Sequence, residues 1–99
     1  MDNFELAIPP EALSDPDRFE LLRLWAAHEQ LHVTISSDLE GGAEDFGELL
    51  ADLFEHASRM YAQRDKQSLE EVRDVILEDF QRRIAEPNPS RMGSLPTEH

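Results

Sequence analysis

The stretch that decides the fold is His28-Glu29-Gln30-Leu31-His32-Val33-Thr34-Ile35. In its second half, apolar and polar residues alternate, and β-branched side chains follow one another directly. β-branched residues lose side-chain freedom in a helix and fit well on the surface of a sheet. Alternation of this kind is typical of a strand that buries one face. We therefore predict a strand over residues 31–36.

The first half of the same stretch matches the zinc-protease pattern H-E-x-x-H. In those enzymes the pattern lies on one helix, so that both histidines bind zinc and the glutamate activates the bound water. A zinc-dependent hydrolase would use His28 and His32 as ligands and Glu29 as general base. Its third ligand would be an acidic residue further along the chain: Glu48, Asp52 or Glu55. The β-branched run after His32 disfavours the required helix. We therefore predict no metal site and no cofactor, and keep the zinc hydrolase as the alternative function.

Two further elements are predicted toward the N-terminus. Residues 4–8 alternate and end at a Pro-Pro pair, which indicates a short strand or an extended arm. Ser14-Asp15-Pro16-Asp17 offers a capping side chain, a proline in the first turn and carboxylates at the positive end of a helix dipole. These signals predict a helix from Pro16 to Ala27 or His28, which would connect two parallel strands. Its buried side would draw on the large apolar residues Phe19, Leu21, Leu22, Leu24 and Trp25.

Two helices are predicted after a glycine-containing loop over residues 38–43. Apolar residues recur at helical spacing over residues 46–61, which predicts an amphipathic helix with a broad buried stripe. Ser68 and Glu71 form a capping box that starts the last helix, and Pro87 ends it. The stripe of the first of these helices consists of Phe46, Leu49, Leu50, Leu53, Phe54, Ala57, Met60 and Tyr61, and that of the second of Leu69, Val72, Ile76, Phe80 and Ile84.

The predicted order is therefore strand, helix, strand, helix, helix, which is an α+β fold. We expect one domain over residues 1–86, with a two-stranded sheet packed on helices. Residues 87–99 contain few large apolar side chains and are expected to form a disordered tail. A two-stranded sheet is marginal alone and leaves its edges unpaired. Either the last two helices cover it, or two chains share it.

The composition excludes several classes of function. Acidic residues outnumber lysine and arginine by 22 to 9, and the net charge of −13 argues against binding to nucleic acid or to anionic lipid. The absence of cysteine excludes disulfides and thiolate chemistry. No apolar run approaches the length of a membrane span, and the first residues lack the features of a signal peptide. We expect a cytoplasmic protein.

Several short pieces together resemble a small uncharacterised bacterial family that is known only as a domain of unknown function. The resemblance spans about residues 4–84 and implies a small domain that stands alone, and it assigns no activity, ligand or catalytic residue. The pieces are Leu6-Ala7-Ile8-Pro9-Pro10, Asp15-Pro16-Asp17, Trp25-Ala26-Ala27, His32-Val33 and Leu50-Ala51-Asp52-Leu53.

One further cluster is a candidate pocket. Asp52 and His56 lie one turn apart on the flank of the predicted helix over residues 46–61, and Trp25 and His32 could join them. The structural interpretation of the same residues is an ion pair at the edge of a core, with Trp25 as core or dimer anchor. We expect a small acidic domain that binds rather than catalyses, as a homodimer or with a regulatory protein partner. An acidic antagonist of a basic protein is a third interpretation.

Overall fold

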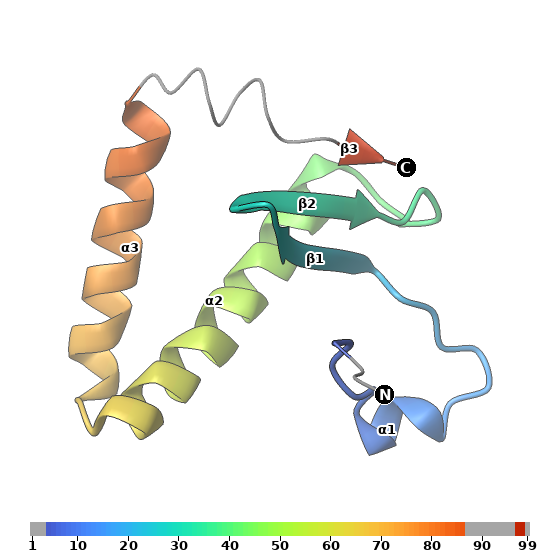
Figure 1. The fold of residues 1–99 in the computed structure, drawn as a ribbon, viewed down its shortest axis with the longest axis horizontal. Coiled ribbons are helices and arrows are strands. Elements are labelled where there is room, and N and C mark those ends of the chain that lie inside the picture. Colours follow the sequence, from blue (N-terminus) through green and yellow to red (C-terminus); the bar gives the residue numbers. More distant parts are fainter. Residues whose placement is uncertain (1–3, 87–96, 99) are drawn as a thin grey trace. The chain divides into compact units, whose positions relative to one another are not determined.

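The computed structural model describes residues 4–86 and 97–98, which form two compact units. The first unit contains residues 4–37 and 97–98, and the second contains residues 38–86. No helix in this described part is long and apolar enough to cross a membrane. Figure 1 shows the elements in chain order as α1 (Pro10–Leu13), β1 (Leu22–Ala27), β2 (Gln30–Ile35), α2 (Ala43–Asp65), α3 (Leu69–Ala85) and β3 (Thr97–Glu98).

The predicted α+β class is confirmed, whereas the predicted order of the first elements is wrong. Residues 4–8 form no strand, and a short helix, α1, starts at the Pro-Pro pair instead. The helix predicted over residues 16–28 is absent, and β1 occupies its second half. The helix-start signals are used in a turn: the Asp15 carboxylate accepts a hydrogen bond from the Asp17 N–H at 2.8 Å. Asp side chains make such turns as readily as they cap helices.

β1 and β2 form an antiparallel hairpin that pairs Leu22 with Ile35 and Ala27 with Gln30. The two turn residues, His28 and Glu29, both have left-handed backbones, with φ of 54° and 59°. This is the conformation of a two-residue hairpin turn whose twist matches that of the strands. The predicted parallel crossover is therefore replaced by a tight antiparallel connection.

The register of the hairpin separates an apolar face from a mixed face, because successive side chains of a strand point to opposite sides. The mixed face carries Arg23 beside Thr34 and Trp25 beside His32. The apolar face carries Leu22 beside Ile35, Leu24 beside Val33 and Ala26 beside Leu31. The predicted one-sided strand over residues 31–36 is confirmed as β2, within one residue at each end.

A third short strand pairs with the hairpin. β3 runs parallel to β2, with Thr97 opposite Val33 and Glu98 opposite Thr34. The disordered tail predicted over residues 87–99 otherwise lies outside the described residues.

The second unit is a pair of helices, α2 and α3, and both are predicted by their periodicity. α2 extends beyond the predicted helix over residues 46–61 at both ends and finishes at Asp65. The next residue, Lys66, has a left-handed φ of 54° that turns the chain. There the Gln67 N–H donates to the Ala62 carbonyl at 3.0 Å. α3 starts where predicted, because the Ser68 hydroxyl accepts a hydrogen bond from the Glu71 N–H at 3.0 Å.

The best-buried residues mark where the two helices meet. Among the described residues, only Val72 on α3 and Ser58 on α2 are buried, at 5 % and 0 % exposure. A serine lets the two helix backbones approach closely. From this meeting point toward the far end of α3 the helices diverge (Figure 1). Near the far end of α3, Phe80 and Ile84 are 53 % and 63 % exposed, and Val75, on another side of the helix, is 66 % exposed.

Candidate association surface

The H-E-x-x-H stretch does not lie on a helix. His28 and Glu29 form the hairpin turn, and His32 lies on β2. The His32 ring is held locally, with its Nε2 atom 3.0 Å from the Ala27 carbonyl oxygen. The helix face that the zinc hydrolase needs is therefore not formed. Among the described residues, no group of three histidine or acidic side chains is placed to hold a metal.

The candidate pocket of four residues is divided between the two units. Trp25 and His32 are direct cross-strand neighbours on the mixed face of the hairpin. Asp52 and His56 lie one turn apart on α2, and both are exposed. The structure thus brings together each pair, while the pocket of all four residues stays a prediction.

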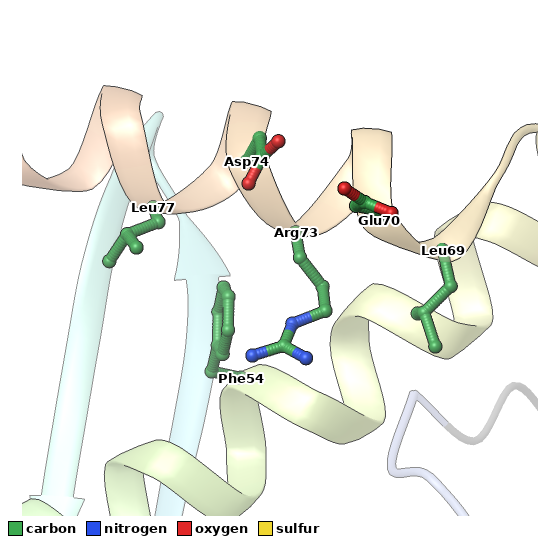
Figure 2. A pocket seen from close by; sticks show the side chains of 6 residues that line it. All are labelled: Phe54, Leu69, Glu70, Arg73, Asp74 and Leu77. Carbon is green, nitrogen blue, oxygen red and sulfur yellow. The ribbon is translucent and has the colours of Figure 1, made fainter.

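The clearest polar contact between the two helices is made by Arg73 of α3. Its guanidinium lies 3.0 Å from the Glu55 carboxylate and 5.5 Å from the centre of the Phe54 ring, both on α2. Figure 2 shows this guanidinium beside the Phe54 ring, in an open hollow of about 470 Å³. The residues that line the hollow are Phe54, Leu69, Glu70, Arg73, Asp74 and Leu77.

The stripe that was expected to be buried on α2 is exposed at four of its eight residues and half-buried at the other four. Contacts to α3 use the flank with Glu55 and Ser58. At about 100° per residue, Leu53 and Met60 lie roughly 140–160° away from Ser58 around the helix. These two side chains are 46 % and 48 % exposed. The sequence correctly indicated which residues form the stripe, but not which part of the molecule packs against it.

The exposed large apolar residues occur throughout the second unit. They come from both helices, including the far end of α3 where the helices diverge. Large apolar side chains that are open to solvent in this number often mark a surface that binds another protein. The residues are Leu50, Leu53, Met60, Tyr61, Leu69, Val75, Leu77, Phe80 and Ile84, which we call the association surface.

Charges at the far end of α3 are balanced locally. The Asp79 carboxylate pairs with Arg83 at 2.9 Å and also with Arg82. The hydrogen bond from Arg83 holds the pKa of Asp79 below its usual range, and the same pair raises the pKa of Arg83. With Glu78 and the capping residue Glu86, this end of α3 has three acidic and two basic side chains. The acidic excess of the chain is therefore not concentrated beside Phe80.

Comparison with known families shows which family the chain belongs to. A family model described as a domain of unknown function, DUF5076, matches residues 5–88. The chain belongs to this family. The DUF5076 assignment agrees with the resemblance seen in the short sequence pieces, and a comparison with curated proteins found no match.

One solved structure resembles this DUF5076 chain over most of its length. It is the structure of a "putative pyruvate dehydrogenase from the photosynthetic bacterium Rhodopseudomonas palustrus CGA009". The two chains are 26 % identical, the match covers 88 % of each, and the TM-score is 0.71. Because the match covers most of both chains, the DUF5076 fold corresponds to nearly the whole of that chain.

Sequence reasoning missed Arg73 as a helix-bridging residue of this DUF5076 domain. On a helical projection it lies within the apolar face of α3, between Leu69 and Leu77. A single charge within an apolar face indicates a partner on the neighbouring helix, and this is the signal that could have identified it.

We expect Arg73→Ala to lower the free energy of unfolding by about 1 kcal/mol, because an exposed ion pair and a contact with an aromatic face each contribute up to about that much. Urea unfolding at fixed protein concentration measures the change. Arg59→Ala is the control, since Arg59 is an exposed arginine of α2. Equal effects of the two substitutions would show that Arg73 does not tie the helices together.

Proposed function

We propose that this domain is a non-catalytic association domain, whose second unit is completed by contact with another protein. The observation that carries the proposal is the association surface, nine large apolar side chains that α2 and α3 leave open to solvent. Covering such side chains is the main favourable contribution to most protein–protein association.

The chain's own sheet is too small to cover this surface in full. Each strand of the hairpin has six residues, which gives a ribbon roughly 20 Å long. α2 and α3 have 23 and 17 residues, which correspond to roughly 35 and 25 Å. A ribbon of that length can lie along part of one helix and not along both. Apolar surface on the helices therefore remains for another protein.

The open apolar area, summed over all sides of the two helices, is comparable to that of a specific interface. From their exposed fractions, the nine side chains expose on the order of 850 Å², and a standard interface buries about 800 Å² on each partner. At about 25 cal/mol per Å², covering that surface on one partner is worth on the order of 20 kcal/mol before the costs of association.

The name of the solved relative suggests a different role, in pyruvate dehydrogenation, for that protein. The geometry described for this chain favours association: its most distinctive residues are apolar and lie on open helix faces.

Thiol chemistry tests the proposal directly, because the chain has no native cysteine. Leu53→Cys places a single thiol on the association surface, and Asp52→Cys places one on the neighbouring exposed position. We expect the thiol at position 53 to react as fast as the control when the chain is dilute and alone. It should become protected when a partner, including another copy, is bound.

Sedimentation of the same samples gives the mass at which protection occurs. A thiol at position 53 that is protected in a chain sedimenting as one copy would contradict association through α2. That result would mean that the chain covers the stripe by itself.

A further inference from the structure

We infer that the partner of α2 is the α2 helix of a second copy, packed antiparallel about a twofold axis that passes beside Leu53. This inference rests on the proposed function and specifies its partner and geometry. Three observations on α2 support it: the position of its open stripe, the order of residues along that stripe, and the distribution of charge along the helix.

The apolar stripe of α2 is open at three positions along the middle of the helix. Leu50, Leu53 and Met60 are all close to half exposed, whereas Phe46, Leu49 and Ala57 are half-buried. A line of apolar side chains along one face of a helix is the shape that a second helix can cover.

Two pairs of stripe residues are placed symmetrically about Leu53. Phe46 and Met60 lie at equal distances along the chain on either side of it, and so do Leu49 and Ala57, whereas Leu50 corresponds to His56. In a twofold interface, if residue i contacts residue j, then j also contacts i. An antiparallel second copy therefore brings Leu53 next to Leu53 of that copy. It also sets Phe46 against Met60 and the large Leu49 against the small Ala57.

The charges of α2 favour the antiparallel direction. Residues 43–53 contain four acidic side chains and no basic one. Residues 54–66 contain three basic and two acidic side chains. Antiparallel packing places the acidic half of one helix against the basic half of the other. Parallel packing would set the two acidic halves side by side, which is costly for chains that each carry a net charge of −13.

Disulfide trapping of single-cysteine variants tests this geometry. Under mild oxidation, Leu53→Cys should form a disulfide-linked dimer, because two cysteines can bond only when their Cα atoms are within roughly 7 Å. Met60→Cys is the matched control, since Met60 is exposed to the same degree as Leu53. It should not link to itself, but it should link to Phe46→Cys when the two variants are mixed.

Each outcome bears on the inference. Self-linking at position 53, Phe46–Met60 linking in the mixture and a wild-type mass of two chains support it. Equal self-linking of Leu53→Cys and Met60→Cys would indicate a parallel pair and overturn it. A monomeric wild type with a freely reactive thiol at position 53 would also overturn it, while leaving the association surface open for a different protein. A monomer with a protected thiol at that position would overturn this inference and also the α2 part of the proposed association surface.

Discussion

Ser58→Leu is expected to lower the free energy of unfolding by about 2–3 kcal/mol, and Ser58→Ala to raise it by about 1 kcal/mol. Ser58 is completely buried where α2 meets α3, and its hydroxyl has no hydrogen-bond partner in the described part of the chain. A larger side chain at such a position forces the helices apart, which costs about 1–3 kcal/mol. Removing an unsatisfied buried hydroxyl relieves a desolvation cost of about 1–3 kcal/mol, and alanine also favours the helix.

Urea unfolding at one fixed protein concentration measures both changes at Ser58. Gln63→Ala, an exposed substitution on the same helix, controls for helix propensity and should change stability by no more than about 0.5 kcal/mol. If Ser58→Ala instead destabilises the protein, the hydroxyl makes a hydrogen bond, for instance to a carbonyl of the preceding helical turn. If Ser58→Leu is tolerated, the two helices are not in close contact at this position.

The second large effect is expected at the hairpin turn. Replacing His28 by Asn and Glu29 by Gly together should raise the free energy of unfolding by about 1–2 kcal/mol. Both native residues have left-handed backbones, with φ of 54° and 59°. That conformation costs an ordinary residue about 1 kcal/mol, whereas Asn-Gly adopts it readily and is the preferred sequence for this turn.

Thermal unfolding of the turn double variant, followed by the fluorescence of Trp25, measures this effect close to the turn. Glu29→Ala is the control, since it removes the carboxylate and keeps the strain, and it should leave stability nearly unchanged. Lower stability of the double variant would mean that the imidazole or the carboxylate makes an interaction worth more than the strain. The double variant also removes two of the three residues of the zinc alternative, so retained assembly would show that assembly does not need them.

The N-terminal half shows why local sequence signals can mislead. The residues of β1 include Leu, Arg and Ala, which are strong helix formers, and the segment follows an apparent helix start. The same residues also alternate, with Leu22, Leu24 and Ala26 on one side. Local preference favoured the helix, and pairing with β2 favoured the strand. The turn itself was not recognised, because His-Glu is not among the residue pairs typical of this hairpin turn.

The sequence by itself determined both long helices, the strand β2 and the α+β class. Each of these follows from a long or strictly periodic pattern, and such patterns depend only on which residues must share a face. The capping serine of α3 was equally predictable from the sequence, because its hydroxyl bonds to a backbone N–H only three residues further along the chain.

Only the tertiary structure decided that residues 22–27 are a strand, that Arg73 bridges two helices, and that α3 covers the Ser58 flank of α2 and not its apolar stripe. Each of these depends on residues distant in sequence, and a hydrophobic pattern shows that a face is to be buried without showing what buries it. The hydrophobic effect is non-directional, so the same stripe can be covered by its own chain or by another. Here α3 meets α2 at the small Ser58, because close approach of the helix backbones requires a small side chain there. The stripe of α2 is consequently not covered by α3.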